Sequence, residues 1–319
     1  MSQRGTILLA GPTASGKSQL ALRLGEALGE FGGARIINAD SMQVYRELHV
    51  VTARPTAKDE ARVPHRLYGV MSALEVCSAG RWRDLALAEI AAAHAAGQVP
   101  IVVGGTGMYL RVLLQGLAPV PAIPGEIRAA ARRRMGELGH DAFRAELAKR
   151  DAESAAAIKP NDLQRLIRAW EVVEATGATL PEWQRQGAGD AFAGPTAKLV
   201  LLPDREQVVR ACDDRVVRMV EEGVKEEIAR FDALNPSDDL PATRAVGVRE
   251  FRAWVRGAAT EEETIATVQR STRQYAKRQF TWFRTQAADW RAFGTKNGQY
   301  PESLFQEIFP FIRDYLLTH

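Results

Sequence analysis

Hydrophobic residues follow two different repeats along the first 117 positions of the chain. Three short and largely apolar runs have the length of buried strands: "TILLA" (Thr6–Ala10), "RIINAD" (35–40) and "VPIVVGG" (99–105). Between them, residues 20–28 and 81–96 place leucine and alanine at helical spacing, and Gly97 ends the second of these segments. Strands that alternate with helices predict an α/β fold with a parallel sheet flanked by helices.

The pattern changes at the proline-rich segment "GLAPVPAIPG" (116–125). Residues 126–186 carry only helical spacing, whereas "AKLVLLP" (197–203) is again a strand-sized apolar run, and helices dominate from there to residue 319. A helical block between two strands favours an insertion over a second domain in series. We therefore expect a core made of residues 1–120 and 196–319, with a helical C-terminal part, and an all-helical insertion at 121–195.

Composition narrows the class of protein. The 319 residues are 46% hydrophobic and 25% charged, which is typical of a soluble globular protein. The apolar runs are too short to span a membrane, and the N-terminus lacks the basic start and long apolar run of a secretory signal. Cys77 and Cys212 lie far apart in the sequence, which is typical of free thiols in a reducing compartment. We expect a cytoplasmic protein with no membrane partner.

The formal net charge of +3 hides a strongly basic segment. Residues 201–263 contain 15 acidic and 10 basic residues, whereas residues 264–288 contain no acidic residue and five basic ones, which are Arg270, Arg273, Lys277, Arg278 and Arg284. We predict a helix at 267–284 with Val268, Tyr275 and Trp282 on an apolar stripe and the cations on another face. Such a face is often simply solvated. The interleaved aromatic residues favour a nucleic-acid backbone as its partner.

The loop after the first strand has the sequence "GPTASGKS" (11–18), which matches the phosphate-binding pattern G-x-x-x-x-G-K-[ST]. Its backbone N–H groups and the start of the next helix attract phosphate oxygens. Lys17 offers a cation for the terminal phosphate, and Ser18 offers a hydroxyl for Mg²⁺. We expect phosphate binding by Gly11, Pro12, Thr13, Ala14, Ser15, Gly16, Lys17 and Ser18.

Two further polar segments follow predicted strands, "NADSMQ" (38–43) and "GGTGMY" (104–109). Asp40 could hold Mg²⁺, accept a proton from a nucleophile, or simply cap a turn. Gln43 suits the edge of an adenine, and Thr106 could donate its hydroxyl to a phosphate oxygen. Because the carboxyl ends of parallel strands meet at one edge of a sheet, we expect these segments to lie beside the phosphate loop.

The phosphate loop alone is compatible with a kinase, an NTPase or an enzyme that releases diphosphate. Kinases and NTPases usually carry an acid at the end of an apolar strand, and "IVVGG" (101–105) has none. This weakens both alternatives.

Taken in order, seven segments resemble the tRNA dimethylallyltransferase family in its bacterial form. They are "GPTASGKS", "NADSMQVYRELHVVTARPT", "PHRLYGV", "PIVVGGTGMYL", "PNDLQRLIRAWEV", "AVGVREF" and "TRQYAKRQFTWFR", and they extend from residue 11 to residue 284. The resemblance implies a P-loop NTPase-like core with an inserted helical domain. It also implies transfer of a dimethylallyl group from its diphosphate to N6 of the adenine 3′-adjacent to the anticodon, position 37, in tRNAs reading codons that start with U. Diphosphate would be released.

By this resemblance, the phosphate loop holds a leaving group. Lys17 and Mg²⁺ near Ser18 would neutralise the diphosphate, and Thr106 and Arg244 would contact it. Asp40 would take the proton from the adenine N6. The adenine would be held by Ser41, Met42 and Gln43. The anticodon stem-loop would be gripped by Asp40, Thr106, Arg128, Gln164, Arg165, Leu166, Ile167, Arg168, Arg273, Lys277 and Arg278.

Three positions depart from the family pattern: Arg54 in "VTARP", Gly69 in "PHRLYG" and Val248 in "AVGVREF". Two other functions stay open, a small-molecule enzyme (a P-loop kinase or an adenylate isopentenyltransferase) and a non-catalytic RNA-binding protein. The helical insertion and the basic helix argue against the first, and the intact set Lys17, Ser18 and Asp40 argues against the second. We expect a monomer, because one tRNA per chain needs no dimer.

Overall fold

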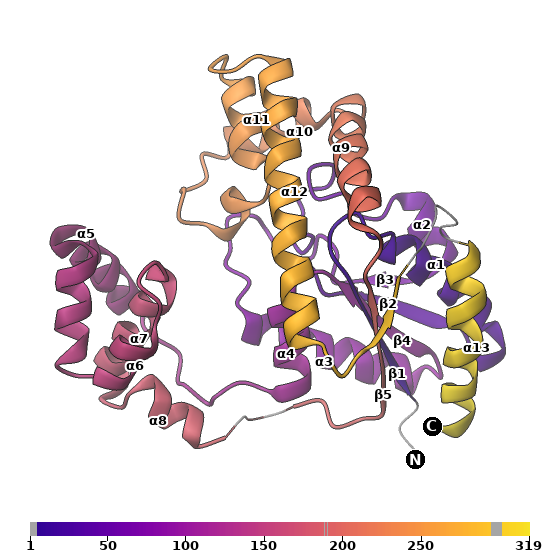
Figure 1. Cartoon of the computed structure of the whole chain (residues 1–319), viewed down its shortest axis with the longest axis horizontal. Helices are drawn as coiled ribbons and strands as arrows, with labels where there is room; N and C mark the ends of the chain where they lie inside the picture. Colours follow the sequence, from indigo (N-terminus) through magenta and orange to yellow (C-terminus); the bar gives the residue numbers. More distant parts are fainter. Residues whose placement is uncertain (1–4, 188, 190, 295–301) are drawn as a thin grey trace. The chain divides into compact units, whose positions relative to one another are not determined.

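A parallel sheet forms the centre of the fold (Figure 1). The computed structural model describes residues 5–187, 189, 191–294 and 302–319. Within these residues the sheet has six strands in the order β3-β2-β4-β1-β5-β6, and every neighbouring pair is parallel. The strands are β1 (Thr6–Ala10), β2 (Ala34–Asn38), β3 (His65–Arg66), β4 (Val99–Gly104), β5 (Thr196–Leu201) and β6 (Arg291–Phe293). This confirms the predicted α/β fold.

Helices lie on both faces of the sheet, which is why its central strands are apolar on both sides. Every residue of β1 is buried, and Ile7 and Leu9 share a core with α1 (Lys17–Ala27) and α13 (Glu302–Thr318). The other helices of this part of the chain are α2 (Ala57–Arg62), α3 (Ala79–Ala95), α4 (Gly107–Gln115), α9 (Arg205–Glu221), α10 (Val224–Ala233), α11 (Val248–Val255) and α12 (Glu261–Gln286), with 3₁₀ segments η1 (Leu28–Phe31) and η2 (Pro241–Arg244). Helices α10 and α11 pack against each other and against α9 and α12, away from the sheet (Figure 1).

The chain divides into two compact units, a core unit (Met1–Leu113 and Ala193–His319) and a helical unit (Leu114–Phe192). The sequence places the corresponding boundaries at 121 and 195. The helical unit contains α5 (Gly125–Ala148), α6 (Ala152–Ala157), α7 (Leu163–Thr176) and α8 (Leu180–Arg185). It has its own apolar core, in which Phe143 and Leu147 of α5 pack with Leu166 and Trp170 of α7. Among the described residues, no helix is both long and apolar enough to cross a membrane.

The buried face of α12 differs from the predicted apolar stripe. The stripe that the structure buries is Thr264, Val268, Thr272, Ala276, Gln279 and Phe283. Tyr275 and Trp282, which the sequence assigns to the core, are only half-buried. The prediction is wrong here because hydrophobicity favours tyrosine and tryptophan over threonine and glutamine. Helix α12 packs mainly against α9 and α11. Thr264 and Thr272 can be buried because their hydroxyls donate to carbonyls one turn earlier in the same segment, and Gln279 because it bonds to the backbone of two loops.

Candidate active site

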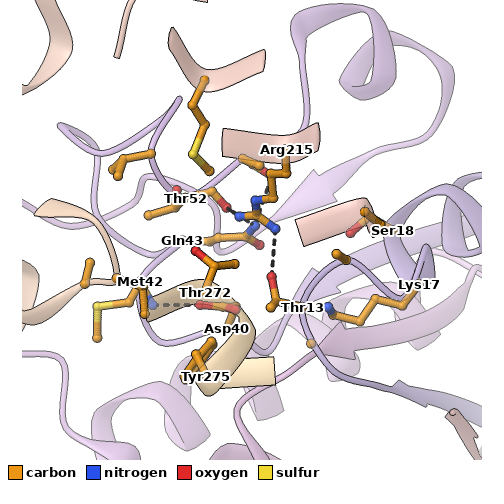
Figure 2. Close-up of a pocket in the computed structure, with 18 of the residues that line it drawn as sticks. Thr13, Lys17, Ser18, Asp40, Met42, Gln43, Thr52, Arg215, Thr272 and Tyr275 are labelled. Carbon is orange, nitrogen blue, oxygen red and sulfur yellow. Dashed lines mark hydrogen bonds between the residues drawn. The ribbon is translucent and has the colours of Figure 1, made fainter. Parts of the chain in front are cut away.

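A cavity of about 630 Å³ opens at the carboxyl ends of β1, β2 and β4 (Figure 2). Each of these strands continues into one of the polar segments described above, and the parallel sheet brings the three segments to the same edge. Residues 51–53 and helices α9 and α12 complete the walls. All lining residues belong to the core unit.

The phosphate loop forms one wall of this cavity. Helix α1 begins at Lys17, directly after Gly16 in the left-handed conformation (φ 77°), so the unpaired N–H groups of its first turn lie at the loop. The Lys17 ammonium donates to the carbonyl of Pro12 at 3.1 Å. Burial lowers the pKa of Lys17 to about 8; the charge of Asp40 raises it, and the charge of Arg215 lowers it further. Ser18 is exposed and lines the same cavity.

Asp40 is held in place by hydrogen bonds between its backbone and the buried side chain of Asn38. The Asn38 side chain accepts from the Asp40 N–H at 2.8 Å and donates to the Asp40 carbonyl at 2.9 Å. One carboxylate oxygen of Asp40 accepts from the Met42 N–H at 2.9 Å, so the residue does cap a turn (Figure 2). The carboxylate also lines the cavity, and this leaves its second oxygen for a ligand.

Thr106 supports this segment from β4. Its hydroxyl oxygen accepts from the Ser41 N–H at 2.9 Å and donates to the Ser41 hydroxyl at 3.3 Å, and its own N–H donates to the Ala39 carbonyl at 3.2 Å. The sequence predicts that this hydroxyl contacts a phosphate. In the structure it contacts Ser41, which lines the cavity, and Thr106 itself is half-buried, so a contact to phosphate stays a prediction.

Arg215 of α9 is a cavity residue that the sequence reasoning missed. Its guanidinium donates to the Thr13 hydroxyl at 2.9 Å and to the Thr52 carbonyl at 2.8 Å (Figure 2). Its Nε has no hydrogen-bond partner among the described residues. Burial lowers the pKa of Arg215, and the nearby charge of Asp40 raises it. A signal does exist, because Arg215 interrupts the apolar stripe of α9 formed by Val208, Cys212 and Met219.

The expected adenine contacts at 41–43 divide into two kinds. Ser41 and Met42 line the cavity. The Gln43 amide nitrogen is engaged, because it donates to the Thr52 carbonyl at 2.9 Å and to the Ala53 carbonyl at 3.1 Å. This corrects the expectation of a freely available amide: only the Gln43 side-chain carbonyl can accept from a ligand without breaking these bonds.

The loop that carries Thr52 is anchored by Glu227 of α10. This carboxylate is 5% exposed and accepts from the backbone N–H groups of His49, Val50 and Val51 at 2.7–2.9 Å. Three charge-assisted bonds fix the loop in place. The Thr52 carbonyl can therefore serve as a fixed acceptor for Arg215 and Gln43.

Arg244 lies at the end of η2 and lines the cavity, about half exposed and 3.5 Å from an oxygen of Asp239. The next helix, α11, begins at Val248. Two departures from the family pattern pack together outside the cavity. The Arg54 guanidinium lies so close to Gly69 that a Cβ there would be 2.3 Å from it.

Four cations of α12 are exposed, Arg270, Lys277, Arg278 and Arg284, and these are candidates to meet a polyanion. Arg273 is half-buried and paired with Asp213 of α9, so its charge is already compensated. The sequence treats Arg273 as equivalent to Lys277, and the structure separates the two.

In the helical unit, Arg128, Gln164 and Arg165 are exposed, and Arg168 lies 3.4 Å from Glu171. Leu166 is fully buried in the core of this unit and Ile167 packs against it. This corrects the expected RNA contact by the Leu166 side chain, which the apolar spacing of α7 requires inside.

Comparison with known proteins links this geometry to a family. The sequence model described as "IPP transferase" matches residues 43–286. The chain is 49% identical over 312 residues to a tRNA dimethylallyltransferase of Parvibaculum lavamentivorans, over 98% of this chain and 97% of that protein. It is 51% identical over 293 residues to a tRNA dimethylallyltransferase of Rhodospirillum centenum, over 91% of each.

Solved structures give the same picture. The full-length tRNA isopentenylpyrophosphate transferase from Bacillus halodurans superposes with a TM-score of 0.70 at 31% identity, over 99% of this chain and 97% of that chain. A eukaryotic dimethylallyltransferase, described as acting on tRNA, superposes with a TM-score of 0.83 at 25% identity, over 99% of this chain and 80% of that chain.

The lowered pKa of Lys17 predicts pH-dependent binding of an alkyl diphosphate. The charged ammonium is lost as pH rises through about 8, so the dissociation constant should increase roughly five- to tenfold between about pH 7.5 and pH 9. The ligand stays fully ionised over this range. Titration calorimetry measures the constant. Lys17→Arg is the matched control, because a guanidinium keeps its charge and should flatten the profile. A flat profile in the unsubstituted protein would remove Lys17 from the phosphate site.

Proposed function

The chain belongs to the IPP transferase family, and we propose that it moves the dimethylallyl group of dimethylallyl diphosphate to N6 of adenine 37 in tRNA. It is a prenyl transferase that modifies tRNA. One observation carries the detailed proposal: a single cavity beside a helix with exposed cations is lined by the buried cations Lys17 and Arg215 and by Asp40, and its cations outnumber its carboxylates. An anion site and a proton acceptor in one cavity fit a reaction that releases diphosphate and deprotonates a nucleophile.

The phosphate loop and the cations act on the leaving group. As the bond between the allylic carbon and the diphosphate oxygen breaks, negative charge gathers on the diphosphate. The first-turn N–H groups of α1, Lys17 and Arg215 stabilise that charge in a partly buried site, where such contacts are stronger than in water. Arg244, which lines the cavity, adds a further cation.

Asp40 acts on the nucleophile. The lone pair of an adenine N6 is delocalised into the ring, so the amine attacks poorly until a base draws away its proton. The N6–carbon bond forms, the carbon–oxygen bond breaks, and the N6 proton goes to the Asp40 oxygen that does not hold Met42. Thr106 and Asn38 keep that carboxylate oriented through the segment they hold.

The donor atoms at the phosphate loop suit Mg²⁺. The Ser18 hydroxyl and the Asp40 carboxylate line the same cavity, and Mg²⁺ commonly takes one or two protein oxygens together with phosphate oxygens and water. Among the described residues, no group of three or more His, Cys, Asp or Glu side chains could hold a metal without substrate. Ser18 would hold the ion together with diphosphate oxygens, and the ion would neutralise diphosphate charge when bound, while the free Asp40 oxygen stays available as the base.

The RNA partner is the anticodon stem-loop. The target adenine must leave its base stack to reach Asp40, and contacts between protein and RNA backbone offset that cost. Arg270, Lys277, Arg278 and Arg284 provide such contacts on α12, and Arg128, Gln164 and Arg165 provide them in the helical unit. We assign the protein to the cytoplasm, where tRNA is modified. We expect it to act as a monomer.

An acceptor assay tests the reaction. Purified protein with Mg²⁺ and labelled dimethylallyl diphosphate should label bulk tRNA, and nuclease digestion should place the label on one adenosine per acceptor. AMP offered instead of tRNA should stay unlabelled. Label in AMP alone would favour the adenylate isopentenyltransferase, and ATP turnover without prenyl transfer would favour the kinase.

Asp40→Asn tests the base. The variant keeps an oxygen for the Met42 N–H but cannot accept the N6 proton, so single-turnover transfer should fall about 10²- to 10⁴-fold. Affinity for tRNA should change less than about threefold. Asp204→Asn is the matched control, because Asp204 caps α9 by the same contact two residues ahead, to Glu206, and should transfer normally. Parallel loss of tRNA affinity in Asp40→Asn would make Asp40 structural.

Lys277→Ala tests the RNA-facing side of α12. Loss of one phosphate contact should weaken tRNA binding and reduce the slope of log K against log salt by about one. Filter binding across a salt series measures both. Arg313→Ala is the control. It removes an exposed cation of α13 that is paired with Glu30, and it should leave the slope unchanged. An unchanged slope for Lys277→Ala as well would make this face of α12 a solvated surface.

A further inference from the structure

The α12 residue Gln279 is a buried amide that joins two loops of the site. Its side chain is 6% exposed. Its carbonyl oxygen accepts from the Thr13 N–H at 2.7 Å, and its amide nitrogen donates to the Gly105 carbonyl at 2.8 Å. Thr13 belongs to the phosphate loop after β1, and Gly105 follows β4. One side chain therefore bridges two of the three segments that form the cavity.

The loop after β4 is shaped to receive α12. A Cβ on Gly105 would lie 2.4 Å from the Gln279 amide nitrogen, and a Cβ on Gly107 would lie 2.4 Å from the Trp282 ring. No side chain fits at such distances, so these two glycines allow the helix to reach the backbone of the loop. The close approach to this loop is thus made by α12.

The hydrogen bond from Thr13 to Gln279 also affects the positions of the two cations that would bind the diphosphate, Lys17 and Arg215. Thr13 is held on both sides, since its N–H donates to Gln279 and its hydroxyl accepts from Arg215. The neighbouring residue, Pro12, provides the carbonyl that receives the Lys17 ammonium. A shift of the peptide between Pro12 and Thr13 would therefore move the side chains of Lys17 and Arg215.

Glutamine suits this place because it carries one donor and one acceptor group at the end of the same side chain. An apolar residue would leave a buried N–H and a buried carbonyl without partners. A carboxylate would keep the contact to Thr13 but repel the Gly105 carbonyl.

We infer that Gln279 is a positioning residue for the diphosphate: it sets the separation between the phosphate loop and the loop after β4, and thereby the places of Lys17 and Arg215. This inference rests on the proposed function. Gln279 does not line the cavity, so it acts through the loop it holds and touches no substrate.

The test separates affinity for diphosphate from affinity for tRNA. Gln279→Leu should raise the dissociation constant for dimethylallyl diphosphate, measured calorimetrically with Mg²⁺, by about tenfold to a hundredfold. The dissociation constant for tRNA should change less than about threefold. Gln286→Leu is the matched control, because it makes the same change at an exposed position of the same helix and should leave both constants unchanged.

Gln279→Glu adds a signature in pH. When its carboxyl is protonated, it can donate to the Gly105 carbonyl again, so affinity for the diphosphate should recover towards the unsubstituted value as pH falls. Gln279→Leu should show no such recovery.

Two results would overturn the inference. One is an unchanged diphosphate constant in Gln279→Leu while the unsubstituted protein binds and transfers normally. The other is parallel loss of diphosphate affinity, tRNA affinity and melting temperature, which would make Gln279 a stability residue only. If the unsubstituted protein and Gln286→Leu bind no diphosphate, the proposed function itself fails, and the inference fails with it.

Discussion

Cations outnumber carboxylates in the cavity, and this electrostatic imbalance shapes the rest of the site: Lys17, Arg215, Arg218 and Arg244 line it with only Asp40 and Glu222. Burial disfavours the charged forms of Lys17 and Arg215, as their lowered pKa values show. The protein holds them with neutral oxygens, the carbonyls of Pro12 and Thr52 and the hydroxyl of Thr13. Such contacts orient a cation without cancelling its charge, so the cavity favours an anionic ligand. In the proposed function, a diphosphate would supply the negative charge, and stabilisation of that charge would favour its release as the leaving group.

The acceptors of these cations need fixed positions, and segments distant in the sequence provide them. Glu227 of α10 anchors the loop of Thr52 through three backbone N–H groups, and Gln279 of α12 anchors Thr13. Helix α12 thus has two surfaces with different tasks. Its inner face holds the phosphate loop and the loop after β4 through Gln279, and its outer face carries exposed cations. In the proposed function, one helix would therefore serve both substrates.

The features that depend on local sequence were predictable. The phosphate loop, Asp40 at the end of β2 and the parallel sheet follow from spacing within a few residues. Arg215, Glu227 and Gln279 were not predictable in their roles, because their partners lie 163–266 residues away in the sequence. The error on α12 has a related cause: an apolar scale takes no account of hydrogen bonds, whereas buried Thr272 donates to the Val268 carbonyl of its own helix and buried Gln279 bonds to two loops. Of these three residues, only Arg215 could be suspected from the sequence, because it is a cation within the apolar stripe of α9.

The sequence separation of contacting segments constrains the order in which the protein can fold during its synthesis. Strand β1 pairs with β5 across the entire helical unit, and the phosphate loop next to β1 meets Gln279 across 266 residues. Closing such long loops is slow. A chain made from its N-terminus can pair β1 with β5 once Leu201 has been made, but it cannot form the Gln279 contacts until the last third of the chain has emerged. The helical unit has a local core of its own and can form earlier. During synthesis, the finished catalytic cavity is therefore one of the last parts of the molecule to exist.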